Sequence, residues 1–384
     1  MQYRKIGKTG ERASALGFGC MRFPIIDGKA HQIDEKRATA MIRYAINHGV
    51  DYFDTAYPYH KSDRSKKGRS EPFLGKVLRD FPRDEFKIAT KLPSWLVKSK
   101  KDMDIYLDDQ LRRLRTDYID FYLLHGLAAA SWKNLRGHKV LDFLDDALSD
   151  GRIRHAGFSF HDELPLFKEI VDAYDWGFCQ IQYNYMDEDN QAGTKGLKYA
   201  ASKKLGVIVM EPLLGGFLGN KLPRDIRRKV DRAAPKRTPA ELALRFLWDK
   251  REVSLVLSGM TTMSQLRENV RTADKAKPGC LTRGEKALID KVRKGLRSKS
   301  MIPCTGCKYC MPCPSGVDIP GCFEQLNHGH MYNDISYAKR AYAWTVDPKS
   351  RASKCTECGK CEELCPQGVK IRDNLKDVVK ELEG

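Results

Sequence analysis

Three consecutive segments decide the fold: Ile119-Asp-Phe-Tyr-Leu-Leu-His125, Leu141-Asp-Phe-Leu-Asp-Asp-Ala-Leu-Ser149 and Ile153-Arg-His-Ala-Gly-Phe-Ser-Phe160. The first and third segments are short runs of branched and aromatic residues, which are typical of strands buried on both faces. The apolar residues of the middle segment recur at helical spacing. Two buried strands joined by a single helix predict a parallel βαβ unit.

The same alternation continues on both sides of this unit, from the first residues to about Gly295. Candidate strands are Leu16–Cys20, Tyr52–Ala56, Phe86–Leu92, Ile119–His125, Ile153–Phe160, Phe178–Asn184, Val207–Pro212 and Val253–Ser258. Amphipathic stretches lie between them: Lys36–His48, Glu71–Arg79, Asp102–Leu114, Leu141–Ser149, Glu163–Asp172, Gly196–Lys204, Pro239–Trp248 and Met263–Thr272. Eight such units predict an α/β protein of the (β/α)8 TIM barrel type.

A doubly wound nucleotide-binding sheet is the competing fold. Gly17-Phe-Gly19 at the end of the first strand resembles the start of a dinucleotide fingerprint. However, the third glycine of that fingerprint would fall at Arg22, and no helix opens directly after it. The sequence therefore favours the barrel.

Composition and charge narrow the classes of function. With 384 residues, 41% hydrophobic and 31% charged, the chain can bury a sizeable core. The start of the chain lacks the apolar core of a signal peptide, and no apolar run reaches the ~20 residues of a membrane span, so we expect a cytoplasmic protein without a membrane partner. The net charge is +18, yet the basic residues are scattered, which disfavours a nucleic-acid partner. A basic run with Lys61, Arg64, Lys66, Lys67 and Arg69 is compatible with an anionic substrate or acidic partner, and equally with a solvated loop.

The composition changes near Lys299, which predicts a barrel domain over residues 1–298 and a small, mostly helical domain over residues 299–384. The second domain contains Cys304-Thr-Gly-Cys307-Lys-Tyr-Cys310-Met-Pro-Cys313-Pro314 and Cys355-Thr-Glu-Cys358-Gly-Lys-Cys361-Glu-Glu-Leu-Cys365-Pro366. Three evenly spaced thiolates followed by Cys-Pro favour two [4Fe–4S] clusters. A pair of zinc sites is the alternative, because zinc also binds four cysteines with this local spacing.

The two cysteine runs resemble the bacterial two-cluster ferredoxin pattern. This resemblance implies that Cys304, Cys307 and Cys310 share one cluster with Cys365, and that Cys355, Cys358 and Cys361 share the other with Cys313. The first run departs from the pattern by having two residues, not three, before Cys313. The remaining cysteines, Cys20, Cys179, Cys280 and Cys322, are expected to be small buried hydrophobes.

Four chemically active residues fall at the ends of neighbouring predicted strands. Asp54 and Tyr59 lie at the end of the second strand, Lys91 closes the third and His125 closes the fourth. Because the carboxyl ends of barrel strands converge on one mouth, we expect these side chains to face a common space. The next loop, Gly126–Gly137, contains Trp132 and is expected to overhang the mouth.

This constellation resembles the aldo/keto reductase family over nearly all of residues 1–298. The matching segments are Gly17–Met21, Asp54–Tyr59, Ser70–Gly75, Lys91, Leu123–His125, Gly151–Arg154, Gly157–Ser159, Gln180–Asn184, Glu211–Leu213 and Gln265–Asn269. The resemblance implies NAD(P)H-dependent reduction of an aldehyde or ketone to an alcohol, or the reverse reaction. Tyr59 would donate the proton, Lys91 held by Asp54 would favour its phenolate, and His125 would orient the carbonyl oxygen.

The resemblance also implies a set of cofactor contacts: Gly19, Cys20, Met21, Asp54, Ser159, Gln180, Met210, Pro212, Leu213, Gly259, Thr261, Gln265, Glu268 and Asn269. Three positions depart from the family pattern, namely His60, Phe160 and Met210. Gly259 and Gln265 stand where NADPH-preferring relatives place a Lys and an Arg on the 2′-phosphate. NADH is therefore slightly favoured over NADPH.

A second class of function remains open, in which the barrel binds nucleotide without carbonyl turnover and the protein serves as an electron-transfer or redox-sensor protein. The cysteine domain could then pass electrons to a redox protein partner. In an enzyme it could instead be structural or shape the pocket for the small-molecule substrate.

Overall fold

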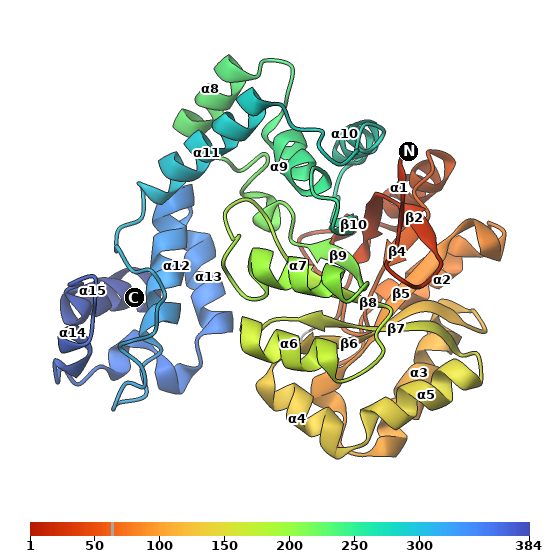
Figure 1. Ribbon diagram of the computed structural model, residues 1–384, viewed down its shortest axis with the longest axis horizontal. Coiled ribbons are helices and arrows are strands. Elements are labelled where there is room, and N and C mark those ends of the chain that lie inside the picture. The colour runs from red at the N-terminus through yellow and green to blue at the C-terminus, as the bar shows by residue number, and fades with distance from the viewer. Residues whose placement is uncertain (63–64) are drawn as a thin grey trace. The chain divides into compact units, whose positions relative to one another are not determined.

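The computed structural model describes residues 1–62 and 65–384. The chain forms two compact units (Figure 1). The barrel unit comprises Met1–Gly215 and Ala240–Thr282, and the C-terminal unit comprises Gly216–Pro239 and Arg283–Gly384. The change in composition predicts a domain boundary between residues 298 and 299. The compact units differ from this boundary, because residues 216–239 and 283–298 belong to the C-terminal unit.

The barrel unit contains a closed barrel of parallel strands, which confirms the predicted fold (Figure 1). Around the barrel the strand order is β10-β3-β4-β5-β6-β7-β8-β9. The strands are β3 (Leu16–Gly19), β4 (Tyr52–Asp54), β5 (Lys87–Leu92), β6 (Ile119–Leu127), β7 (Ile153–Phe160), β8 (Phe178–Gln182), β9 (Gly206–Met210) and β10 (Val253–Ser258). Most of their side chains are buried, as expected of a barrel covered by helices.

A short antiparallel hairpin, β1 (Tyr3–Lys5) with β2 (Arg12–Ser14), precedes the barrel and was not predicted. Ile6 and Ala13 are fully buried in one apolar cluster with barrel residues such as Phe121. Gly7 has φ +50°, and a Cβ there would lie 2.1 Å from the backbone nitrogen of Gly206. The hairpin therefore packs at the amino-terminal end of β9, opposite the mouth.

Helices alternate with the strands around the barrel. They are α1 (Glu35–Asn47), α2 (Ser70–Leu78), α3 (Lys100–Leu114), α4 (Ala129–Gly137), α5 (Val140–Ser149), α6 (Leu164–Asp172), α7 (Gly193–Ser202), α9 (Pro239–Trp248) and α10 (Met263–Ala273). Within the described ranges, no helix is both long and apolar enough to cross a membrane.

The prediction of a loop at Gly126–Gly137 is wrong for most of this segment, because Ala129–Gly137 forms helix α4. Trp132 is only 4% exposed. Its indole nitrogen donates to Glu169 of α6 at 3.0 Å. The side chain is held against a neighbouring helix, so it does not overhang the mouth.

The C-terminal unit is almost entirely helical. Its helices are α8 (Arg224–Ala233), α11 (Arg283–Arg297), α12 (Ile319–Tyr332), α13 (Ile335–Thr345), α14 (Lys360–Glu363) and α15 (Ile371–Val378). Ion pairs join the α8 segment to the α11 segment, from Lys299 to Asp225 at 3.1 Å and from Arg237 to Glu285 at 3.2 Å. A separate apolar core lies between α12, α13 and α15 and includes Phe323, Leu326 and Leu375.

Candidate active site and cluster sites

The fold brings the four predicted catalytic side chains to the carboxyl ends of three neighbouring strands. Asp54 is the last residue of β4, and Tyr59 lies in the loop that follows. Lys91 lies near the end of β5, and His125 lies near the end of β6. The register pairs β4 with β5 and β5 with β6, so the three strand ends are adjacent.

Lys91 is fully buried and makes the central contacts of this group. Its ammonium donates to both carboxylate oxygens of Asp54, at 2.8 and 2.7 Å, and to the carbonyl of Thr55 at 2.7 Å. It also contacts the Tyr59 hydroxyl at 3.4 Å. A buried cation is thus paired with a carboxylate on one side and faces a phenol on the other.

The pKa values of these groups reflect burial opposed by neighbouring charges. Burial lowers the pKa of Lys91, but Asp54 and Tyr59 outweigh it, so the ammonium stays charged. Burial raises the pKa of Tyr59 and outweighs the opposing Lys91 ammonium. Tyr59 is therefore protonated at neutral pH, and the Lys91 ammonium beside it would stabilise a phenolate at this position.

His125 is neutral at neutral pH. Burial, followed by the charges of Lys91 and His161, lowers the pKa of its imidazole well below the ordinary value. Its ring lies edge-on to Tyr59 with centroids 6.1 Å apart, and 5.0 Å from the ring of Trp95. Trp95 was not singled out from the sequence, although a tryptophan three residues after the end of a barrel strand is a signal that could have identified it.

The residues expected at the nicotinamide end lie on the next strands around the barrel. Ser159 of β7 and Gln180 of β8 are buried, at 1% and 2% exposure. The Ser159 hydroxyl accepts a hydrogen bond from the backbone nitrogen of Gly126 at 2.7 Å. The Gln180 amide nitrogen lies 3.3 Å from the sulfur of Met210 at the end of β9. The Gln180 carbonyl oxygen is buried and has no partner among the described residues.

The residues expected along the rest of the nucleotide also lie at strand ends. Gly19 ends β3, Cys20 is buried and Met21 is 56% exposed. Burial raises the pKa of Cys20 well above its ordinary value, so it is a thiol rather than a thiolate. Pro212 and Leu213 lie in the loop that follows β9, after Glu211.

The residues expected at the adenosine end surround the start of α10. Gln265 is engaged in the helix cap, where its side chain accepts from the backbone nitrogens of Thr261 at 2.9 Å and Thr262 at 3.2 Å. Asn269 donates to Ser258 at 3.0 Å. Glu268 lies one residue before it on the same helix. A side chain at Gly259 would meet the stem of Arg22, since a Cβ there lies 3.0 to 3.2 Å from it.

The basic run after Tyr59 is mostly solvated. Lys61, Lys66 and Arg69 are exposed, and Lys67 pairs with Asp109 at 2.8 Å. Arg64 lies outside the described residues.

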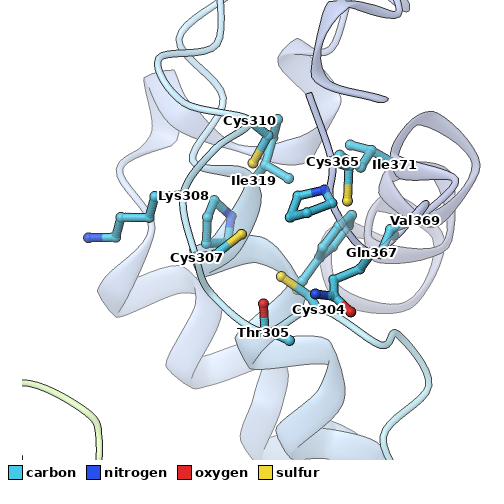
Figure 2. Close-up of a pocket in the computed structure, with 13 residues that line it drawn as sticks. Cys304, Thr305, Cys307, Lys308, Cys310, Ile319, Cys365, Gln367, Val369 and Ile371 are labelled. Atoms are coloured by element: carbon cyan, nitrogen blue, oxygen red, sulfur yellow. The ribbon is translucent and has the colours of Figure 1, made fainter. Parts of the chain in front are cut away.

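The eight cysteines of the two runs form two groups, and each group takes three members from one run and one from the other. The first cavity, about 340 Å³ and open to solvent, is lined by Cys304, Cys307, Cys310 and Cys365. Figure 2 shows the four sulfur atoms directed toward one space and Lys308 pointing away from it. The second cavity, about 300 Å³, is lined by Cys313, Cys355, Cys358 and Cys361. These are the two groups that the ferredoxin resemblance implies.

The chemistry of both cavities fits iron–sulfur clusters. Each has four thiols and an apolar wall, and backbone nitrogens donate to sulfur from Gly306 to Cys304 and from Glu357 to Cys355, both at 3.4 Å. Such hydrogen bonds to sulfur tune cluster potentials.

Of the other cysteines, Cys20, Cys179 and Cys322 are fully buried, and Cys280 is partly buried. None of them lines either cavity.

Comparisons with known proteins give the same division of the chain. Residues 15–278 match the aldo/keto reductase family, and residues 303–370 match a 4Fe-4S dicluster domain. L-galactose dehydrogenase from Arabidopsis thaliana is 28% identical over 70% of this chain and 87% of its own length. L-glyceraldehyde 3-phosphate reductase from Escherichia coli O157:H7 is 27% identical over 71% of this chain and 87% of its own.

A solved structure agrees with these sequence matches. The aldo-keto reductase AKR11C1 from Bacillus halodurans, in its holo form, superposes with a TM-score of 0.61 at 27% identity. It covers 76% of this chain and 96% of its own length. The chain therefore belongs to the aldo/keto reductase family of oxidoreductases and carries a 4Fe-4S dicluster domain after its barrel.

Proposed function

We propose that this protein uses NADH or NADPH to reduce the carbonyl group of a small molecule to an alcohol, or catalyses the reverse oxidation. The observation that carries this proposal is the buried Lys91 ammonium, which contacts Asp54 at 2.7 Å on one side and the Tyr59 hydroxyl at 3.4 Å on the other. A phenol beside a permanent cation is suited to give and take a proton.

The residues at the mouth fit a nicotinamide. The buried Gln180 carbonyl oxygen lacks a partner among the described residues, and a carboxamide could satisfy it. Ser159 lies on the neighbouring strand and offers a further polar group. When bound, the reduced nicotinamide supplies a hydride to the carbonyl carbon.

The chain's own residues then handle the proton. Tyr59 donates its hydroxyl proton to the carbonyl oxygen as negative charge develops there. Lys91 stabilises the resulting phenolate, and Asp54 keeps the lysine in place. The neutral imidazole of His125 can donate a hydrogen bond to the same oxygen and so orient the carbonyl.

We further propose that Cys304, Cys307, Cys310 and Cys365 bind one [4Fe–4S] cluster and that Cys313, Cys355, Cys358 and Cys361 bind the other. Hydride transfer moves two electrons together, whereas each cluster carries one, so the clusters have no direct part in the proton and hydride step. They would stabilise the C-terminal unit or exchange electrons with a redox protein.

The names of two relatives refer to L-galactose and to L-glyceraldehyde 3-phosphate. We therefore propose a hydroxylated aldehyde, ketone or sugar as the first substrate class to examine, with and without a phosphate group.

The test is Tyr59→Phe, with Tyr57→Phe as a matched control that removes a hydroxyl from the same loop. On a panel of sugars and simple aldehydes, Tyr59→Phe should lower turnover by ~10²–10⁴-fold. NADH binding, followed by nucleotide fluorescence, should persist in both variants. Near-normal turnover by Tyr59→Phe would contradict the assignment. Tight nucleotide binding without turnover of any carbonyl by the unsubstituted protein would favour the electron-transfer or sensor function instead.

A further inference from the structure

Behind the Lys91 side chain lies a buried polar network that the proton-transfer chemistry does not use. Its centre is Glu71, in the first turn of α2, whose side chain is fully buried. One carboxylate oxygen accepts from the Thr90 hydroxyl at 2.6 Å and from the Gln110 amide at 2.8 Å. The other accepts from the Arg113 guanidinium at 2.8 Å.

Thr90 and Gln110 connect the network to β5, the strand that carries Lys91. The Gln110 amide nitrogen donates to the backbone carbonyl of Lys91 at 3.0 Å. The Gln110 carbonyl oxygen accepts from the buried Tyr122 hydroxyl at 2.9 Å. Thr90, which donates to Glu71, is the residue directly before Lys91. The lysine backbone is therefore fixed both through its own carbonyl and through its neighbour.

Arg113 connects the network to the loop that carries Tyr59. Arg113 donates to the backbone carbonyl of Gly68 at 2.6 Å. Gly68 packs directly on the Tyr59 backbone, because a Cβ at Gly68 would lie only 1.8 Å from the Tyr59 carbonyl oxygen. The Ser70 nitrogen donates to that same carbonyl at 3.2 Å. A shift of Arg113 would thus reach the Tyr59 backbone through Gly68.

We propose that Glu71, Gln110 and Arg113 are positioning residues that set the distance between the Lys91 ammonium and the Tyr59 hydroxyl. Among the described residues, Glu71 accepts a hydrogen bond from Gln110 on the side of Lys91 and one from Arg113 on the side of Tyr59. A buried ion pair contributes little net stability compared with apolar packing. The role of the Glu71–Arg113 pair is geometric, because it fixes the backbone segments of Lys91 and Tyr59 relative to each other. The inference rests on the proposed role of Tyr59, and its test does not need a substrate.

The test measures the ionisation of Tyr59 directly. The 16 tyrosines are replaced by 3-fluorotyrosine, and the Tyr59 resonance in the fluorine NMR spectrum is assigned by its loss in Tyr59→Phe. The groups that face Tyr59 are Lys91, Asp54, Cys20 and His125. Among them the Lys91 cation lowers the pKa of Tyr59, so loosening the contact raises the titration midpoint.

The two test variants leave the net charge unchanged. Gln110→Met removes the bonds to Lys91 and Glu71 at similar volume, and Glu71→Asp keeps the carboxylate but shortens its reach. Each should raise the Tyr59 midpoint by about half a pH unit or more. The matched control is Asp120→Glu, which perturbs the partly buried pair of Asp120 with Arg83 at the other end of the barrel, 2.6 Å apart.

Unfolding midpoints in urea accompany each titration. The proposal expects Asp120→Glu to lose stability without moving the Tyr59 midpoint. It is overturned if neither test variant moves that midpoint upward, or if Asp120→Glu moves it as far. Lack of carbonyl turnover in the unsubstituted protein would refute the proposed function but leave this titration readable, so the two failures are distinguishable.

Discussion

Lys91 combines a buried structural contact with a role in the chemistry that we propose. It is fully buried, and its charge is matched by Asp54 on the neighbouring strand. Such a pair persists because removing either partner leaves an uncompensated buried charge. Its position at the contact with Tyr59 explains why an apolar residue of similar size would be a poor replacement.

Lys91→Met tests both roles at once. Breaking the buried pair should lower the free energy of unfolding by about 3–5 kcal/mol, since Asp54 is left buried without its cation. Carbonyl turnover should fall about as far as in Tyr59→Phe. Urea unfolding and steady-state turnover check the two effects. Wild-type stability together with full turnover would show that Lys91 serves neither role.

His328 of α12 gives a pH dependence to the C-terminal unit. Its ring packs against Phe217, Tyr332 and Tyr337, with centroid distances of 4.7, 4.6 and 5.3 Å. Burial lowers the pKa of His328 to about 4. The unfolded chain, with a histidine pKa of ~6.5, therefore binds this proton first as the pH falls.

The contribution of neutral His328 to the free energy of unfolding is fully present above about pH 6.5 and is lost as the pH falls toward 4. Between pH 7 and pH 5 the loss should be about 2 kcal/mol of unfolding free energy. His328→Phe keeps the ring packing and removes the proton site, so it should lose about 2 kcal/mol less than wild type over that range. Urea unfolding at the two pH values measures this difference, and equal losses in both proteins would contradict it.

At the scale of elements, the strands could be predicted and some of their connections could not. The eight predicted strands match the structure in order. The bounds of β7 and β10, such as Val253–Ser258, also match, whereas the other strands differ from the prediction by one or two residues at one or both ends. The hairpin β1–β2 escaped prediction because each strand has only three residues and carries charged side chains. Helix α4 escaped because Trp132 is its main apolar anchor, and only the packing against α6 reveals it.

The same distinction applies to the candidate site. Asp54, Lys91 and His125 could be expected at one mouth because parallel strand ends converge in a barrel. The contacts of Glu71 with Gln110 and Arg113 could not, since they depend on how α2 and α3 pack against each other. Sequence spacing along one helix carries no information about that distance.

The start of α10 bears on the choice of nucleotide. Gln265 occupies the helix cap through Thr261 and Thr262, and Gly259 has no side chain to offer a phosphate. We expect NADH to bind at least as tightly as NADPH. Adding cations in the double variant Gly259→Lys with Gln265→Arg should raise the affinity for NADPH relative to NADH by at least about tenfold, because a charge-assisted hydrogen bond contributes ~1.5–3 kcal/mol.

Fluorescence titration of both reduced nucleotides at one salt concentration measures the ratio. Binding of NADPH tenfold tighter than NADH by the unsubstituted protein would refute the expectation. Gln265→Arg alone serves as a control for the loss of the helix cap, which should cost about 1 kcal/mol of stability without changing the ratio as far as the double variant does.

At the scale of the whole molecule, the two cysteine runs are interdependent. Cys365 belongs to the second run in sequence but lines the first cavity, and Cys313 does the reverse. The crossing joins segments about fifty residues apart around each proposed cluster, so neither site is complete within one run. Cluster assembly and folding of this unit are therefore expected to depend on each other.

The exchange of Cys365 and Cys313 between the two runs leads to a prediction that the spacing of the cysteines in the sequence alone would not give. Cys365→Ser should remove the same cluster as Cys304→Ser, although Cys365 lies only four residues from Cys361. Each variant should retain about four of the eight irons expected for two cubanes. The electron paramagnetic resonance spectrum of the reduced Cys365→Ser protein should match that of Cys304→Ser and differ from that of Cys355→Ser. Cys322→Ala, which changes a buried cysteine outside both cavities, should keep the full iron content. If Cys365→Ser instead gave the Cys355→Ser spectrum, each run would hold its own cluster and the crossed assignment would be wrong.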